Sequence, residues 1–292
     1  MTRRTPVLGA ALVIAVSLPA HAQLPPSFRS TVDTVLLTVS VKDNGRPVLD
    51  LTQKDFEVRD NNVAQAFEVA GPESLPVDIT LVVDVSGSSR GPVLESLTRA
   101  INSVGSHLGP ADRASLVTFN HRVHEVRPLT SGWAAVKFEP GTGATSLFDA
   151  ATAALIAAPE PGRRRMAILF TDGRDTGSFV DGSTLVDVAR RADTSLFIIA
   201  VTPGTAMMPQ RTPYDALFQS WTTSTGGMLT VLQQDQSIGS AFDKAFEQFG
   251  TSYVLRYTYK GPVKPGWHPV TVRVLRRPTY QVGVREGYFA EE

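Results

Sequence analysis

The chain has 292 residues, with 28 basic and 28 acidic side chains and no cysteine. This balance leaves no electrostatic footprint for nucleic acid or for an anionic membrane surface, so neither is expected as a partner. Without cysteine there is no disulfide and no lipid anchor attached through a thiol, so the core alone must hold the fold. The length suits one large domain with a smaller companion.

The amino terminus has the pattern of a removable export signal. Two arginines precede an apolar run at residues 7–18, and Ala20-His21-Ala22 offers a small-x-small cleavage site. The run is shorter than the roughly 20 apolar residues that span a bilayer, and no later segment reaches that length. We therefore expect residues 1–22 to be cleaved after Ala22, leaving an exported protein, periplasmic or secreted, without a transmembrane segment.

Residues 23–75 predict a small N-terminal β segment after a short polar linker. Residues 31–41 alternate between apolar and polar, and Asn44-Gly45 marks a tight turn. Residues 51–58 have the pattern of a capped helical turn that leads into another strand. A sheet of this size is marginal by itself.

Between residues 76 and 250 the pattern changes to strands that alternate with helices. The uncharged, β-prone run at 79–83 indicates a central strand covered on both faces. The alternation predicts an α/β fold with a doubly wound, mostly parallel sheet. Strands are expected at 79–83, 114–119, 123–129, 166–171, 196–201 and 228–232, and helices at 93–108, 147–158, 184–192, 214–223 and 237–249.

Residues 251–292 return to alternating strands, at 253–259 and 269–275. Neither this tail nor the leading segment is long enough to bury a core alone. Each also has one apolar face to cover. We therefore expect the two flanks to pair into one smaller antiparallel β unit, with the domain of residues 76–250 inserted between them.

Oxygen-bearing side chains gather at predicted strand ends. Three follow the strand at 79–83, one lies in a glycine-rich loop that opens a helix, and one follows the strand at 166–171. If these two strands are neighbours where the strand order reverses, both aspartates face one crevice. Hard oxygen ligands suit Mg²⁺, with Mn²⁺ or Ca²⁺ as alternatives. The candidate metal ligands are Asp84, Ser86, Ser88, Thr145 and Asp172.

The same residues resemble the metal-ion-dependent adhesion site of the von Willebrand factor type A domain family. That site combines Asp-x-Ser-x-Ser, a distant Thr in a loop before a helix, and a later Thr-Asp-Gly. The flanks at 45–56 and 285–289 also resemble bacterial von Willebrand factor A-related exported proteins. The residues that match the site, in the family's order, are Asp84-x-Ser86-x-Ser88, Thr145 and Thr171-Asp172-Gly173.

This resemblance implies a non-enzymatic, metal-dependent adhesion or protein-binding module. Two aspartates neutralise a divalent cation, while the hydroxyls coordinate it without adding charge. The metal then stays electrophilic, and the implied partner is a protein that presents an Asp or Glu carboxylate. Ala144 stands where the family often has Gly, so a positive φ at this position would strain the loop that carries Thr145.

Other readings of these residues stay open. Gly87-x-Ser89-x-Gly91 has the context of a serine hydrolase nucleophile elbow, with Asp172 and His268 as the remaining members of a triad. A structural module with a degenerate site is a second alternative, and N-caps for the next helix are a third role for Asp84 and its neighbouring serine.

Several nearby polar residues favour local roles. His121 and His124 point to opposite faces of a strand, which argues against a shared zinc ion. Asp149 is expected to complement the dipole of the helix that it opens, and Asp175 to be a solvated loop charge. The three arginines at 163–165 are expected in a solvated loop at the opposite rim.

Overall fold

The computed structural model describes residues 34–71, 75–87, 91–139, 141–157, 160–201, 214–233, 236–260 and 265–290. The expected export signal at residues 1–22 lies outside these ranges, as do Ser88 and Ser89 of the two sequence motifs. Among the described residues, no helix is both long enough and apolar enough to cross a membrane.

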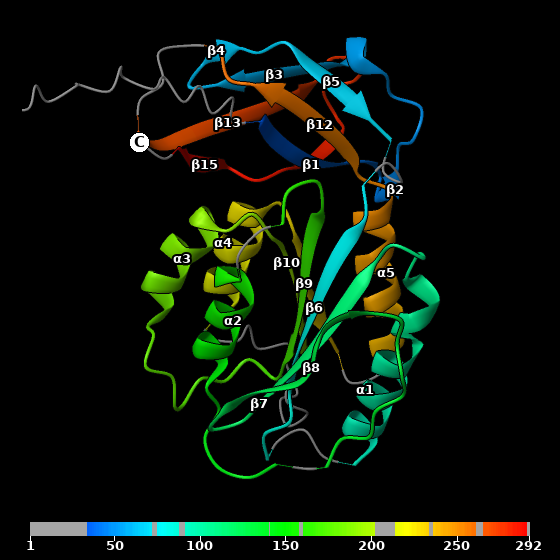
Figure 1. Cartoon of the computed structure of the whole chain (residues 1–292), viewed down its shortest axis with the longest axis vertical. Coiled ribbons are helices and arrows are strands. Elements are labelled where there is room, and N and C mark those ends of the chain that lie inside the picture. The colour runs from blue at the N-terminus through cyan, green and yellow to red at the C-terminus, as the bar shows by residue number, and fades with distance from the viewer. Residues whose placement is uncertain are drawn as a thin grey trace, which may run out of the picture. The chain divides into compact units, whose positions relative to one another are not determined.

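A six-stranded sheet lies at the centre of the α/β part of the chain, which runs from β6 to α5 (Figure 1). The strand order is β11-β10-β9-β6-β7-β8, and all neighbours are parallel except β7 and the edge strand β8. The strands are β6 (Val77–Asp84), β7 (Arg113–Phe119), β8 (Val123–Ser131), β9 (Arg164–Thr171), β10 (Ser195–Val201) and β11 (Met228–Leu232).

The uncharged run predicts the central position of β6 correctly. Leu81, Val82 and Val83 are each 0% exposed, and the strand pairs with β7 on one side and β9 on the other. From β6 the chain adds β7 and β8 in one direction and then returns to add β9, β10 and β11 in the other. The strand order therefore reverses between β6 and β9, at the place that the sequence indicates.

Helices cover both faces of this sheet (Figure 1). On one face, α1 and α5 pack against Leu81 and Val83. On the other face, α2, α3 and α4 pack against Val82 and Leu169. The helices are α1 (Pro92–Asn102), α2 (Leu147–Ile156), α3 (Gly182–Arg191), α4 (Asp215–Thr225) and α5 (Ile238–Gly250).

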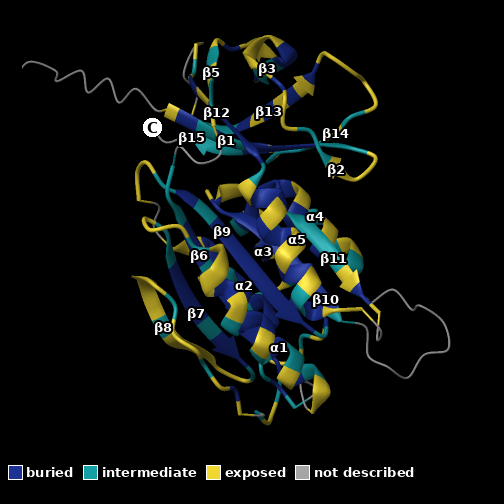
Figure 2. Ribbon diagram, turned by 90° about the vertical axis from the view of Figure 1, so that its right-hand side faces the viewer, coloured by how far each residue is buried: buried dark blue, intermediate teal, exposed yellow. Residues whose placement is uncertain are grey.

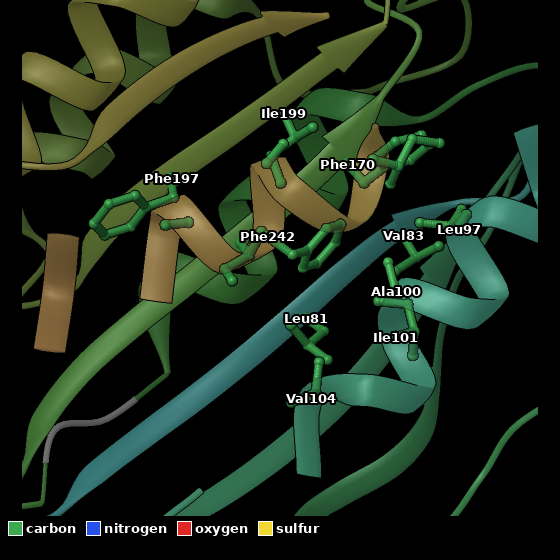
Figure 3. Close-up of a cluster of buried hydrophobic side chains, with 14 of the residues drawn as sticks. Leu81, Val83, Leu97, Ala100, Ile101, Val104, Phe170, Phe197, Ile199 and Phe242 are labelled. Atoms are coloured by element: carbon green, nitrogen blue, oxygen red, sulfur yellow. The ribbon is translucent and has the colours of Figure 1, made fainter. Parts of the chain in front are cut away.

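Figure 3 shows the core on the face covered by α1 and α5. Phe242 of α5 and Leu97 of α1 have at most 1% of their surface exposed. They pack in one cluster with Leu81 and Phe170 of the strands. Each side chain of this kind stabilises the fold by roughly 1.5–3 kcal/mol when it is fully buried. The edge strand β8 contributes little to this core, because eight of its nine residues are exposed. Figure 2 colours exposed residues yellow.

The two flanks interleave in two antiparallel sheets, called here the β unit. Its sheet orders are β14-β1-β12-β5, with β2 added to β1, and β15-β13-β3-β4. Because β1 pairs with β12 and β3 with β13, the prediction that the flanks form one unit is confirmed. The strands are β1 (Thr34–Asp43), β2 (Arg46–Pro47), β3 (Phe56–Asp60), β4 (Val63–Ala64), β5 (Phe67–Ala70), β12 (Tyr253–Thr258), β13 (Gly266–Val274), β14 (Gln281–Gly283) and β15 (Gly287–Ala290).

Two tight turns of the β unit follow from their residues. Asn44 and Gly45 have φ of 49° and 79°, and Asn61 and Asn62 have φ of 48° and 63°. Paired left-handed residues match the twist of a hairpin, and Asn and Gly tolerate them best. The predicted helical turn is also present as the short η1 (Gln53–Asp55), whose capping box joins Thr52 and Asp55.

Three expectations about the fold need correction. The helix expected at 93–108 ends at Asn102 and continues as the 3₁₀ segment η3 (Ser103–His107). Strands β14 and β15 were not expected. The expectation that residues 163–165 form a solvated loop is wrong. Arg164 begins β9 and is 4% exposed, and Arg163 pairs with the Asp78 carboxylate at 2.7 Å.

Candidate metal centre

Asp84 ends β6 and is fully buried, with 0% of its surface exposed. Its Oδ1 accepts a hydrogen bond from the Ser86 backbone N–H at 2.9 Å, and its Oδ2 accepts one from the Thr171 hydroxyl at 3.2 Å. These two bonds hold the carboxylate at the strand tip. The N-cap of α1 is Gly91 without a side-chain cap, so the alternative role as N-caps is wrong.

Asp172 follows β9, the strand next to β6. Val83 pairs with Phe170 in parallel register, so Asp172 lies at the same carboxyl edge of the sheet as Asp84. The side chain is partly exposed, and its Oδ1 accepts a hydrogen bond from the Arg174 N–H at 3.3 Å. The strand order therefore brings the two aspartates to neighbouring strand tips.

Thr145 reaches this edge on the loop before α2 and is 7% exposed. Its N–H donates to the Thr176 hydroxyl at 2.9 Å, and its carbonyl accepts from the N–H groups of Thr176 and Gly177 at 2.9 and 3.1 Å. At the other end of the loop, the Gly141 N–H donates to the Val85 carbonyl at 2.7 Å. The loop is therefore fixed both to the segment after β6 and to the segment after β9.

At two positions of this loop the geometry requires glycine. A Cβ added at Gly141 would lie 2.4 Å from the Val85 carbonyl oxygen, so no larger residue fits without a shift. Gly143 has a φ of 94°, whereas Ala144 is not among the described residues with positive φ. The residue with left-handed backbone in this loop is therefore Gly143. Ala144 does not adopt a positive φ, so it is not strained.

Four of the five candidate ligands lie at this edge of the sheet. Ser86 is 1% exposed and follows Asp84 directly in the loop after β6. The place of Ser88 stays a prediction, because this residue lies outside the described ranges. A ligand role for each residue also stays a prediction, since placement at one edge does not by itself make a site.

The electrostatics of the site suit a cation. Burial raises the pKa of Asp84 to about 6, and the nearby Asp172 carboxylate acts in the same direction against the hydrogen bonds from Ser86 and Thr171. Within the described ranges, no Lys, Arg or His pairs with either aspartate. The two carboxylates are thus left without a positive partner among those residues.

The donor set decides which cation fits. The part of the chain that the structure describes holds no group of three or more His, Cys, Asp or Glu side chains arranged for a metal. A metal here would therefore be bound by two carboxylates together with hydroxyls. Such an all-oxygen set fits Mg²⁺, Mn²⁺ or Ca²⁺ better than a soft metal.

Two acidic residues near the site have roles that sequence reasoning missed. Asp175 is not a solvated charge, because its Oδ1 accepts from the N–H of Leu147 at 2.9 Å and so caps α2. Asp149 does more than complement a helix dipole: its carboxylate accepts from the N–H groups of Phe179 and Val180, each at 3.0 Å. Both aspartates therefore anchor the segment that follows β9 to the first turn of α2.

His268 and His121, of the hydrolase and zinc alternatives, contact other groups in the described structure. His268, the third member of the hydrolase alternative, is 1% exposed on β13, and its Nδ1 lies 3.0 Å from Asp60 Oδ1 in the β unit. That geometry pairs it with Asp60 and not with Asp172. His121 and His124 are both exposed, and the Nδ1 of His121 lies 3.2 Å from the Thr142 carbonyl oxygen.

The described fold is an α/β domain in which four of the candidate residues lie at the carboxyl ends of neighbouring strands. Residues 78–216 match the family model of the von Willebrand factor type A domain. Over these residues the α/β part of this chain is similar to that family. A search of the curated proteins found no match.

Solved structures show similarity at the level of the fold. Proximal thread matrix protein 1 from the mussel byssus, with a zinc-occupied MIDAS motif, is 17% identical at a TM-score of 0.50, covering 64% of this chain and 49% of that one. This chain thus spans about half of the byssus protein. The manganese-loaded Plasmodium vivax TRAP protein is 19% identical at a TM-score of 0.41, covering 77% of this chain and 99% of that one. BatB from Bacteroides thetaiotaomicron is 17% identical at a TM-score of 0.43, covering 60% and 100%.

Proposed function

We propose that this chain is an exported, non-enzymatic protein-binding module that works through a divalent cation. Asp84, Ser86, Ser88, Thr145 and Asp172 would hold the metal, with Mg²⁺ as the expected ion and Mn²⁺ or Ca²⁺ as alternatives. The observation that carries the proposal is the fully buried Asp84 carboxylate beside the tip of β9, where Asp172 follows and no basic side chain of the described ranges compensates either charge.

The chemistry follows from the charges of this donor set. Two carboxylates neutralise a divalent ion, and the serine and threonine hydroxyls add no further negative charge. When bound, the cation supplies a Lewis acid that accepts one oxygen of a partner's Asp or Glu side chain. The residues of this chain hold the carboxylates in place: the Thr171 hydroxyl and the Ser86 N–H orient Asp84, and the Thr176 and Gly177 N–H groups fix the Thr145 segment.

The binding function is favoured over hydrolysis by the position of His268. A serine hydrolase needs its histidine between the nucleophile and the acid. Here His268 is buried against Asp60 in the β unit, with Tyr288 Oη 3.3 Å from the same ring nitrogen. A reactive serine would have no general base from this residue. Labelling of Ser89 by a fluorophosphonate probe would contradict the non-enzymatic proposal.

Titration calorimetry with Mg²⁺ tests the metal site. Asp172→Ala leaves one carboxylate to balance a divalent charge, so we expect binding to weaken by roughly a hundredfold or more while the fold is retained. Asp187→Ala is the matched control, because Asp187 is exposed on α3. Mn²⁺, Ca²⁺ and Zn²⁺ are titrated in parallel. Equal Mg²⁺ affinity for wild type and Asp172→Ala would remove this aspartate from the site.

A further inference from the structure

Phe179 is 100% exposed in the segment that follows β9. Among the described residues it is the one aromatic side chain in the group of large, exposed apolar residues. A single exposed apolar residue is normal on a protein surface and does not by itself mark a binding site. What sets Phe179 apart is how its backbone is held and what lies beside it.

The backbone at Phe179 is fixed by hydrogen bonds to the first turn of α2. Its N–H donates to both carboxylate oxygens of Asp149, at 3.0 and 3.1 Å, and the Val180 N–H donates to Asp149 Oδ1. The preceding Ser178 hydroxyl accepts from the N–H groups of Phe148 and Asp149 at 3.0 and 3.1 Å. The side chain of Phe179 is therefore fully solvated, while the backbone of residues 178–180 is held to α2 by hydrogen bonds.

The same segment is joined to the candidate metal centre. It begins at Asp172, and its Thr176 and Gly177 N–H groups both donate to the Thr145 carbonyl. The Ser146 hydroxyl also donates to the Gly177 carbonyl at 3.2 Å. Phe179 thus belongs to a hydrogen-bonded unit that contains two of the candidate ligands, and its position is set relative to theirs.

The loops beside the candidate site carry exposed charges of both signs. Arg174 and Arg122 are exposed, and neither forms an ion pair with a residue of the described ranges. The acidic side chains nearby are already engaged. Asp149 and Asp175 accept backbone N–H groups, and Asp181 caps α3 through the N–H groups of its first turn. Arg174, two residues after Asp172, therefore offers an exposed positive charge to an approaching carboxylate.

We propose that Phe179 and the metal centre form one two-point docking surface for a protein partner. The partner presents an Asp or Glu side chain next to an apolar patch: the carboxylate reaches the cation, and the Phe179 ring packs into the patch. A rigid aromatic side chain suits this role, because it buries a large area at little conformational cost. This inference rests on the function proposed above and specifies the partner of that site.

The test uses disulfide-closed random peptides displayed on phage. The peptides are selected on the immobilised protein in Mg²⁺, eluted with EDTA, synthesised and measured by titration calorimetry. We expect them to share an acidic residue flanked by apolar ones. Phe179→Ser should weaken their binding about tenfold to a hundredfold, the range expected for uncovering a phenylalanine. The Mg²⁺ affinity of this variant should stay unchanged.

Ile156→Ser is the matched control, because Ile156 is 65% exposed at the far end of α2 from the pinned segment. It should leave peptide affinity unchanged. Equal peptide affinity for wild type and Phe179→Ser would overturn the docking surface, and so would the recovery of no EDTA-eluted peptide from metal-loaded protein. A wild-type protein that takes up no divalent ion would instead overturn the function on which this inference rests.

Discussion

The Thr171 hydroxyl links the two strand tips that carry the candidate ligands. It donates to Asp84 Oδ2 at 3.2 Å and accepts from the Gly173 N–H at 3.0 Å, and Thr171 is 0% exposed. The residue has no proposed contact with the metal. Its hydroxyl nevertheless sets the orientation of a carboxylate and the course of the chain after β9.

Thr171→Val tests this role, because valine keeps the shape and removes the hydroxyl. We predict that Mg²⁺ affinity falls roughly tenfold and that the free energy of unfolding falls by about 1.5–3 kcal/mol, the usual contribution of a hydrogen bond to a charged group. Titration calorimetry and urea unfolding measure the two effects. Thr171→Ser retains the donor and should resemble wild type; matching Mg²⁺ affinities in the valine and serine variants would refute the prediction.

The place of four candidate residues at one edge of the sheet could be predicted from the sequence, because each follows a pattern that marks a strand end or a helix start. The uncharged run before Asp84 identifies the central strand, and the strand alternation places Asp172 at the same edge. The roles of Asp149 and Asp175 could not be predicted in this way. Their backbone partners lie about 30 residues away along the chain, at positions that no local pattern relates to them.

At the scale of elements, the segment from Asp172 to the start of α3 depends on α2 for its shape. Of its ten residues before Gly182, none belongs to a helix or strand. Hydrogen bonds to Asp149, Thr145 and Ser146 replace the ladder that a regular element would supply. The conformation of this segment therefore depends on its contacts with α2 and with the loop before α2.

Asp149→Ala should release this segment without unfolding the domain. The N–H groups of Phe179 and Val180 lose their acceptor, so we predict faster amide exchange at both residues and a loss of about 1 kcal/mol in unfolding free energy. Exchange rates are measured by NMR, with Asp187→Ala as the control on exposed α3. Unchanged exchange at Val180 would show that other contacts hold the segment.

Long elements were predicted well from periodicity, and the short ones were not. Strands β14 and β15 have three and four residues, too few to show an alternating pattern. Their conformation comes from pairing with β1 and β13. At Gly287 an added Cβ would lie 2.3 Å from the His268 carbonyl oxygen, so the close approach that defines β15 appears only in the folded structure.

At the scale of the whole described chain, the β unit encloses the α/β part in sequence. The leading strand β1 pairs with β12 from Thr34↔Thr258 to Val39↔Tyr253, and its core includes Leu37 and Leu255 at 0% exposure. A further buried link joins Tyr257 Oη to Asp60 Oδ2 at 2.8 Å. The N-terminal strands β1 and β3 therefore obtain their main pairing partners from the tail and share one apolar core with it.

Deleting residues 252–292 should unfold the leading segment. The deletion removes β12 and β13, so β1 and β3 lose their main pairing partners, and a lone small sheet is marginal in water. We predict loss of amide protection at residues 35–41, measured by hydrogen exchange. Protection of Leu169 and Ile198 in the central sheet is the internal reference. Retained protection in β1 would mean that the leading segment folds independently.

The C-terminal end of α5 is joined to both parts of the described chain. The Arg164 guanidinium, at the start of β9, donates to the Phe249 carbonyl at 2.7 Å and lies 4.1 Å from the centre of the Phe249 ring. Lys42 Nζ of β1 donates to Gln248 Oε1 at 2.6 Å. Any shift of α5 along the sheet must therefore change its contacts with the β unit, while the candidate metal site lies at the opposite, carboxyl end of the strands.

Lys42→Met tests whether that shift is coupled to ligand binding. Methionine keeps the apolar stem of Lys42 and removes the bond to Gln248, so amide exchange in the last turn of α5 should increase. If ligand at the metal site favours a shifted α5, loosening this contact lowers the cost of the shift. We then predict a rise of between about twofold and thirtyfold in the Mg²⁺-dependent affinity for EDTA-eluted peptides, the range of typical coupling energies.

Lys244→Met, an exposed change on the same helix, should leave both the amide exchange and the peptide affinity unchanged. Faster exchange at the end of α5 together with an unaltered peptide affinity would show that the helix and the metal site are not coupled.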